Sequence, residues 1–487
     1  EVPHCIRDQP RGEGIAEAEL GVCGTGHPGA GAAHHAHGPE REHDAEPPPD
    51  RGHAIDDRVP SAGTLDCIHK QGHPDDGNDD VEGRQPGAGH AGEDVTIGRA
   101  QEDVMADRLV GTNYVTPDIV AKVTGRARYA EDFRAEGMLF CKLMLSERPH
   151  ARIRGIDASR ALALPGVRAI LTPDDVPQLG PTTEHCLTRE PLYAGEPILA
   201  VAAVSEEIAA NAIELIRLDI EPLPHNVDPV DSLRPGAPMA RIDGNVWVTE
   251  GQPPRPTVKA VKWTDADFAE AAAGRMPQGA ATEEWAYGDL DAEFTRADLV
   301  LDETFVVPST GHHPMETRSA MAFWQNGKLH LHCSTQSVVR TVDAVARWVG
   351  IKPEDVVLIC EYTGGGFGSK GGGAVSMAIP ALLSKKANAP VMMRISREEE
   401  SYIGRARTNM VGRLKAGFAK DGRILALDFY IIQDSGPYGP MGDHRSAGNA
   451  ASLIYQPAAM RWRAVNVITN TPPRTQQRSP GPMQANG

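Results

Sequence analysis

Seven of the eleven residues in TGGGFGSKGGG, the segment from Thr363 to Gly373, are glycines. A backbone so poor in side chains becomes ordered only at a high entropic cost, so we expect it where another group must approach closely. The apolar run from Val356 to Cys360 precedes the segment, and a helical pattern from about Ala374 to Lys386 follows it. The glycine loop is therefore predicted to join a strand to a helix in a layered fold.

The residues around the glycine loop show the same alternation of strands and helices. The strict alternation of KLHLHC, Lys328 to Cys333, predicts a strand. Apolar residues with helical spacing from Val338 to Val349, followed by Gly350, predict a helix. Pro380 lies inside the helix predicted after the loop, where we expect a kink.

An earlier segment predicts a small α+β unit. Ile198 to Ala203 is a short apolar run typical of a buried strand, and Ser205 is a suitable N-cap for the helix that follows. The alternation from Ile216 to Ile220 predicts a half-exposed strand. Residues 233–284 show no steady periodicity, so we interpret them as a long connection.

The first 104 residues differ in composition from the rest. They contain no Phe, Tyr, Trp or Met and ten of the 18 histidines, so we predict a disordered leader. The tract AHHAHG, Ala33 to Gly38, could bind a transition metal, but such tracts bind metals promiscuously, which disfavours a dedicated site. A second interpretation is that these residues are not natural protein and that the chain starts at Met105.

Charge, hydropathy and cysteine spacing disfavour several classes of protein. The chain has 49 Lys and Arg against 66 Asp and Glu, and its net charge of -17 has the wrong sign for a nucleic-acid binder. No apolar run approaches the roughly 18 residues of a membrane span, and the N-terminus lacks the apolar core of a signal peptide. We therefore expect a cytoplasmic protein. The seven cysteines include no C-x-x-C pair, which disfavours a zinc ribbon or an iron–sulfur site.

The glycine loop formally satisfies a dinucleotide-binding pattern at Gly366, Gly368 and Gly371. The match is weak, because three residues separate the strand from the first glycine of the loop and no clear ribose-binding acid follows. A phosphate-binding loop of the Walker A type is excluded, because neither Ser nor Thr follows Lys370.

Two groups of histidines are candidate metal ligands. His312 and His313, with Glu316 nearby, are adjacent in sequence, and adjacent residues cannot both face one point on a strand. His330 and His332 share a strand face, but the sequence shows no third ligand. Both patterns disfavour zinc.

Three segments, in the right order, resemble the molybdopterin-binding large subunit of the xanthine dehydrogenase and aldehyde oxidase family. They are STQ (Ser334 to Gln336), GGGFGSK (Gly364 to Lys370) and TNTPPRTQQRSPGPMQ (Thr469 to Gln484). Two earlier segments resemble the α/β hammerhead domain of that family: VTGRARYAEDF (Val123 to Phe133) and YAGEPILAVAA (Tyr193 to Ala203).

The resemblance covers roughly residue 108 to the C-terminus and implies an α+β chain of several parts. We expect a disordered or non-native leader (1–104), a hammerhead domain (105–232), a linker (233–284) and the first, truncated half of a molybdopterin-binding domain (285–487).

The resemblance also implies a cofactor site. Its molybdenum is held by a pterin dithiolene, so the lack of a Cys or His ligand cluster is expected. The family pattern implies that Gln336 donates to an oxygen on the metal, that Phe367 and Gly368 lie beside the metal, and that Arg478 contacts the cofactor. A simple strand-end cap is the alternative role for Gln336. The residues implied to bind the cofactor are Gln336, Gly365, Gly366, Phe367, Gly368 and Arg478.

Departures from the family pattern narrow the substrate. Gly371 stands where purine-oxidising members have an acid, and Ser479 stands where carbon monoxide dehydrogenases have a cysteine. Aldehydes and N-heteroaromatic carbons remain as the expected substrates. Arg445 lies near the position where family members have a substrate-pocket arginine, although its spacing to Arg478 differs by one residue from the family pattern. The alternative is that Arg445 is an exposed arginine of a loop.

The resemblance implies a molybdenum hydroxylase large-subunit fragment that uses water as its oxygen source. Electrons would pass to iron–sulfur and FAD subunits of a hetero-oligomer, and the molybdopterin could be the cytosine dinucleotide form. The family's catalytic glutamate, a general base, is expected beyond Gly487, so we expect the chain alone to be inactive. A non-catalytic binding fragment and a Rossmann-type NAD-dependent dehydrogenase are the alternatives.

Overall fold

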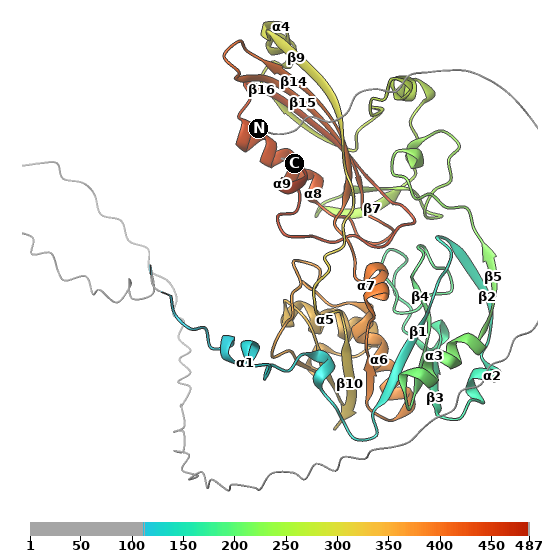
Figure 1. Ribbon diagram of the computed structural model, residues 1–487. Helices are drawn as coiled ribbons and strands as arrows, with labels where there is room; N and C mark the ends of the chain where they lie inside the picture. Colours follow the sequence, from blue (N-terminus) through green and yellow to red (C-terminus); the bar gives the residue numbers. More distant parts are fainter. Residues whose placement is uncertain (1–110, 112, 486–487) are drawn as a thin grey trace, which may run out of the picture. The chain divides into compact units, whose positions relative to one another are not determined.

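The computed structural model describes residue 111 and residues 113–485 (Figure 1). The predicted leader, residues 1–104, lies outside the described residues, as do the histidine tract and Met105. The described residues form mixed sheets with packed helices, which confirms the predicted α+β class. No helix among them is long and apolar enough to cross a membrane.

One seven-stranded sheet combines strands from the early and the late parts of the described chain. Strand β1 (Leu139–Leu145) pairs in parallel with β13 (Val391–Met393) and antiparallel with β4 (Pro197–Ala203). The sheet is therefore continuous across the segments expected to form separate domains. The strand order is β12 (Val356–Ile359), β11 (Lys328–Cys333), β10 (Ala320–Gln325), β13, β1, β4 and β3 (Val167–Leu171).

Two helices, one before β12 and one after the glycine loop, pack against this sheet (Figure 1). The helix predicted after β11 is α5 (Val338–Val349), and Gly350 ends it in the left-handed conformation, as expected. The helix predicted after the loop is α6 (Val375–Ala387), which is one continuous helix with Pro380 inside it. Apolar side chains of both helices share one core with the strands, so the strand ends that carry the loop are held firmly.

The small α+β unit predicted around residue 200 is confirmed. All residues of β4 are buried, and the Ser205 hydroxyl accepts a hydrogen bond from the Ile208 backbone N–H at 3.2 Å, at the start of α3 (Glu206–Leu215). The predicted half-exposed strand is β5 (Arg217–Pro222), which pairs with β2 (Ala151–Asp157).

A second sheet includes part of the segment predicted to be a connection, residues 233–284. Strand β6 (Val246–Glu250) pairs with β7 (Arg255–Lys259), and Trp263 and Phe268 are buried in the core beside this sheet. The segment interpreted as a long connection therefore contains two strands and contributes side chains to a core. Its strands are only five residues long, too short to show a clear period, and they join the sheet through the pairing of β6 with the distant strand β16.

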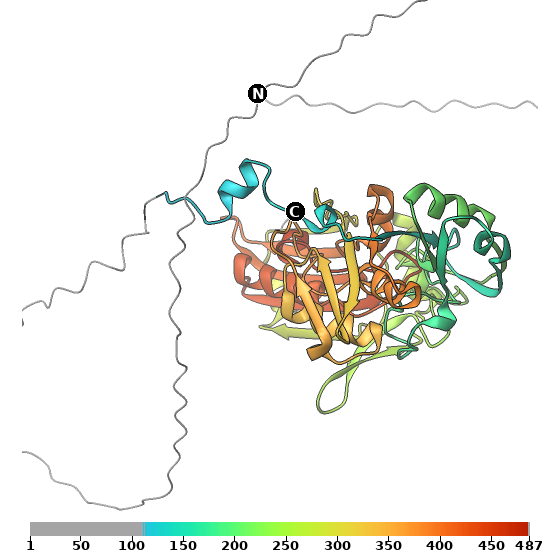
Figure 2. The ribbon, with the colours of Figure 1, turned by 90° about the horizontal axis from the view of Figure 1, so that it is seen from below.

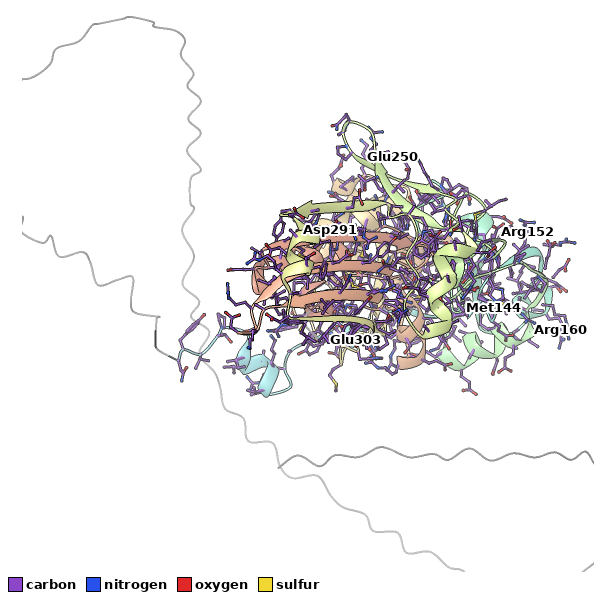
Figure 3. The ribbon with its side chains drawn as sticks, turned by 90° about the horizontal axis from the view of Figure 1, so that it is seen from above. Met144, Arg152, Arg160, Glu250, Asp291 and Glu303 are labelled. Carbon is purple, nitrogen blue, oxygen red and sulfur yellow. The ribbon has the colours of Figure 1, made fainter. Side chains whose placement is uncertain are left out.

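One edge strand of the second sheet is β9 (Leu299–Val307), and Figure 3 labels Glu303 on it. The strand order is β7, β6, β16 (Ala459–Val467), β15 (Ile424–Asp434), β14 (Asn409–Phe418) and β9, and β8 (Glu283–Tyr287) also pairs with β16. The remaining α-helices are α1 (Ile119–Val123), α2 (Ser159–Leu162), α4 (Leu290–Arg296), α7 (Arg397–Ile403), α8 (Asp443–Tyr455) and α9 (Pro482–Ala485). The 3-10 helices are η1 (Ala130–Asp132), η2 (Pro173–Asp175), η3 (Asp231–Leu233), η4 (Asp265–Ala273) and η5 (Pro353–Asp355).

Candidate functional site

An open cleft of about 650 Å³ lies beside the ends of two neighbouring strands, β11 and β12. These strands (gold in Figure 2) are parallel, so the segments that follow them leave the first sheet at the same edge. The cleft is lined by Gln336, Thr363, Gly365, Gly366, Phe367, Gly368, Gln476, Gln477, Arg478 and Pro480.

The cleft brings together all six residues that the resemblance assigned to the cofactor. Gln336 follows β11, the glycine loop follows β12, and Arg478 belongs to the segment after β16. The Arg478 backbone N–H donates to the Phe367 carbonyl at 2.8 Å, which joins the last segment to the loop. The structure thus shows that these residues are neighbours, while their contacts with a cofactor remain predictions.

At two positions of the loop, other atoms of the protein occupy the space that a side chain would need. A Cβ at Gly368 would lie 2.2 Å from the Gln476 carbonyl oxygen, and a Cβ at Gly366 would lie 2.4 Å from Gln336 Oε1. Gly368 also has φ +112°, a conformation that residues with side chains rarely adopt. The close approach inferred from the sequence therefore includes the opposite wall of the cleft.

The side chain of Gln336 is oriented by the glycine loop. Its Oε1 accepts hydrogen bonds from the backbone N–H groups of Gly368 at 2.9 Å and of Lys370 at 3.2 Å. With the oxygen engaged in this way, the amide nitrogen is left to donate, and it has no acceptor among the described residues. Gln336 therefore caps the loop with its side-chain oxygen and also presents N–H groups beside the cleft.

Arg407 holds the segment that forms the second wall. Its guanidinium donates to Gln477 Oε1 at 2.6 Å, to the Arg478 carbonyl at 2.7 Å and to Gln484 Oε1 at 3.0 Å. Burial lowers the pKa of Arg407, and the buried group is compensated by these acceptors. The Arg478 guanidinium, in contrast, is exposed and has no partner among residues 113–485.

Two buried ion pairs lie behind the glycine loop. Lys370 pairs with Glu316 and Arg318 pairs with Glu400, and Arg318 also donates to the Ser369 carbonyl at 2.8 Å. Burial lowers the pKa of Lys370 and that of Arg318, the latter to about 10. The sequence did not indicate these pairs. The acidic partner of each basic residue lies dozens of residues away in the chain, and no local pattern identifies it.

The histidines predicted as candidate metal ligands have other neighbours. His312 is buried, its Nε2 lies 2.9 Å from the Gln476 carbonyl oxygen, and burial lowers its pKa to about 4. His330 and His332 stack on Phe323, with ring centroids 4.8 and 6.3 Å away. Among the described residues, no group of three or more His, Cys, Asp or Glu side chains is arranged to hold a metal.

Arg445, predicted to contact a substrate, does not line the cleft. It lies in α8 and donates to Glu283 on β8 at 2.7 Å and to the Thr249 hydroxyl at 3.0 Å. Helix α8 directs this side chain toward β8, and its contact with a substrate stays a prediction. Although burial opposes ionisation, hydrogen bonds from His444 and Arg445 lower the pKa of Glu283 to about 2.

The lowered pKa of Glu283 predicts that the free energy of unfolding depends on pH. The pKa of Glu283 is depressed in the folded protein, so its stabilising effect is present above its ordinary pKa of 4.5 and is lost as the pH falls toward 2. We expect Glu283→Gln to lower the free energy of unfolding by about 2 kcal/mol at pH 7 and by less at pH 3.5. Urea unfolding of both proteins at each pH measures this, and a difference that does not change with pH would contradict it.

Two family models match the chain. A molybdopterin cofactor-binding domain matches residues 274–486, which include every residue that lines the cleft, and an aldehyde oxidase and xanthine dehydrogenase a/b hammerhead domain matches residues 124–224. The second match coincides with the predicted resemblance.

The chain is also similar to individual proteins whose names fit these two family models. A probable xanthine dehydrogenase component of Bacillus subtilis is 30% identical over 73% of this chain and 44% of its own length. A nicotinate dehydrogenase large molybdopterin subunit of Eubacterium barkeri is 28% identical over 69% of this chain and 72% of its own length. The solved structure of an aldehyde oxidoreductase from Desulfovibrio gigas aligns with a TM-score of 0.63 and 26% identity, over 76% of this chain and 40% of the other.

The chain thus spans less than half the length of the Bacillus and Desulfovibrio proteins. The two matched models follow one another along the chain, and the cleft lies within the second of them. The chain belongs to the xanthine dehydrogenase and aldehyde oxidase family, with a hammerhead domain followed by a molybdopterin cofactor-binding domain.

Proposed function

We propose that the cleft binds molybdenum held by molybdopterin, and that the chain is the cofactor-binding part of a molybdenum hydroxylase large subunit. One observation carries the proposal: Gln336, the glycine loop and Arg478, which are far apart in sequence, line one cleft within the region matched by the molybdopterin cofactor-binding domain. When bound, the cofactor supplies two-electron oxidation of a substrate carbon, with water as the oxygen source.

The hydrogen-bonding groups of the cleft fit an anionic, oxygen-rich ligand. Within the described part of the chain, the backbone N–H groups of Gly365, Gly366 and Phe367 donate to no protein acceptor. The Gln336 amide and the Arg478 guanidinium add further donors. A metal held by a pterin dithiolene needs no protein thiolate or imidazole, and neither lines the cleft among the described residues.

Each group then has a distinct role. Gln336 would donate from its amide nitrogen to an oxygen atom of the cofactor, since its own oxygen is held by the loop. Arg478 neutralises negative charge on the cofactor, because its guanidinium is exposed and unpaired in the described structure. The Phe367 ring, half exposed at the cleft, excludes water from one side of the reacting centre.

The general base is proposed to come from outside the described residues. None of the described residues that line the cleft is an Asp, Glu or His, so none can accept a proton there at neutral pH. We propose that a glutamate from another polypeptide segment completes the site. Hydroxylation by the cofactor-binding part alone is then not expected.

The proposed substrate is an aldehyde or an N-heteroaromatic carbon. The chain has Gly371 after the loop lysine and Ser479 after Arg478, where the family's purine-oxidising and carbon monoxide-oxidising members have an acid and a cysteine. The names of the relatives do not select the substrate, since they include a probable xanthine dehydrogenase component as well as an aldehyde oxidoreductase and a nicotinate dehydrogenase large molybdopterin subunit. Iron–sulfur and FAD subunits are the proposed electron acceptors.

Cofactor analysis of the purified chain tests the proposal. We expect molybdenum and a pterin in equal amounts, and acid hydrolysis that releases cytidine monophosphate would identify the cytosine dinucleotide form. Arg478→Met should lower the retained molybdenum, because it removes a positive charge from the cleft. Arg445→Met is the matched control, since Arg445 is also an exposed arginine but lies outside the cleft. A bound nicotinamide without molybdenum would refute the proposal.

A further inference from the structure

One carboxylate holds both ends of the glycine loop. Glu316, between β9 and β10, accepts hydrogen bonds at Oε2 from the Gly364 backbone N–H at 2.6 Å and from Lys370 Nζ at 3.2 Å. Gly364 begins the run GGGFGSK and Lys370 ends it. The same oxygen also accepts from the Ser334 hydroxyl, and Oε1 accepts from the Ala130 backbone N–H at 3.3 Å.

The ammonium group of Lys370 is fully buried and fully paired. Its side chain has no solvent exposure, and that of Glu316 has only 7%. Besides the Glu316 carboxylate, Nζ donates to the Glu316 carbonyl at 2.7 Å and to the Ser334 hydroxyl at 2.7 Å. Three acceptors match the three protons of an ammonium group, so the network leaves none of them without a partner.

The network also determines the orientation of Gln336. The Lys370 backbone N–H donates to Gln336 Oε1, and the Lys370 carbonyl accepts from the Gln336 backbone N–H at 2.8 Å. A displacement of Lys370 would therefore move the amide group that faces the cleft. Neither Glu316 nor Lys370 is among the residues that line the cleft, so both act on it through other residues.

We infer that Glu316 and Lys370 are positioning residues that hold the glycine loop in its binding conformation before any ligand arrives. A loop with so many glycines has high conformational entropy when it is free, and ordering it during binding would weaken the affinity. A loop that is already ordered by a buried ion pair avoids that loss. The part of this inference that concerns the pterin cofactor rests on the proposed function.

The test removes the ammonium group while keeping the side chain long. In Lys370→Met, without cofactor, we expect the loop amides that donate hydrogen bonds in the parent, those of Gly364 and of residues 368–371, to exchange with deuterium at least about tenfold faster, because the loop opens more often. In protein purified with cofactor, we expect less retained molybdenum per polypeptide. Lys386→Met is the matched control, because Lys386 forms an ion pair with Asp175 that is partly exposed.

A double variant separates loss of loop order from loss of folding. Lys370→Met leaves a buried carboxylate without its partner, whereas Glu316→Gln with Lys370→Met removes both charges and keeps an acceptor for Gly364. We expect the double variant to restore part of the slow loop exchange and part of the molybdenum content. The amides of β11 report global unfolding in every variant.

Each outcome tests either the positioning role of Glu316 and Lys370 or the proposed function. If the loop amides of Lys370→Met exchange as slowly as those of the parent, with β11 protected in both, the positioning role is wrong. If the parent chain holds no molybdenum, the proposed function fails, while the exchange experiment without cofactor still decides whether the ion pair orders the loop. If the loop is loosened but the molybdenum content is unchanged, its order before binding does not matter for the cofactor, and the inference is overturned in that respect.

Discussion

Replacing Gly368 by Val is expected to abolish the retention of molybdenum. A Cβ at this position would lie 2.2 Å from the Gln476 carbonyl oxygen, which is backbone and cannot move without shifting the wall that carries Arg478. The φ of +112° adds strain of about 1–3 kcal/mol for a residue with a side chain. The two walls of the cleft should therefore separate. The molybdenum content per polypeptide, measured by mass spectrometry, should fall below detection.

Gly372→Val is the matched control for this experiment. Gly372 belongs to the same glycine-rich segment, but nothing lies within 4 Å of a Cβ built there and its φ is not in the left-handed region. This variant should retain its molybdenum. Equal molybdenum content in Gly368→Val and the parent protein would show that the cofactor does not depend on this contact between the walls, and would place the binding site elsewhere.

The second large effect is expected in catalysis. We expect no turnover of aldehydes or N-heterocycles by residues 1–487 alone, even when the chain carries the cofactor. No carboxylate or imidazole among the described residues lines the cleft, and a positioned general base contributes about 10² to 10⁴ in rate. Dye reduction with a panel of such substrates, with molybdenum content measured on the same sample, tests this expectation.

Activity should appear when the missing group is supplied. A fusion of this chain to the part of the Desulfovibrio aldehyde oxidoreductase that it does not match is one such test, because this chain covers 40% of that protein. The same fusion carrying Gly368→Val should remain inactive, which ties any activity to this cleft. Steady turnover by the unfused chain would show that a general base lies within residues 1–487 and that the proposed division of the site is wrong.

Much of the local structure near the site could be predicted from the sequence. The alternation in KLHLHC and the helical spacing from Val338 correspond to β11 and α5, and Gly350 ends that helix as predicted. These features depend on residues close together in the chain, so local patterns are enough to reveal them. The six residues selected for the cofactor also lie in one cleft, but they were selected by resemblance to a family and not by geometry.

The buried polar groups behind the cleft could not be predicted in this way. Lys370 and Arg318 are charged residues of a kind usually found at the surface, and only the fold buries them against Glu316 and Glu400. Arg407 likewise has its acceptors in a segment about seventy residues later in the sequence. Their partners are determined by which strands lie together, and a single sequence does not contain that information.

The sequence by itself determined the order of the elements around the glycine loop, the family resemblance and the choice of the six cleft residues. Only the tertiary structure decided that residues 233–284 contribute strands to a sheet, that Arg445 pairs with Glu283 away from the cleft, and that Gly368 is required by the Gln476 carbonyl. The physical reason is the range of the interactions. Helical and strand periodicity comes from neighbouring residues, whereas strand pairing, burial of charge and close packing of backbone depend on segments that meet only when the whole domain has folded.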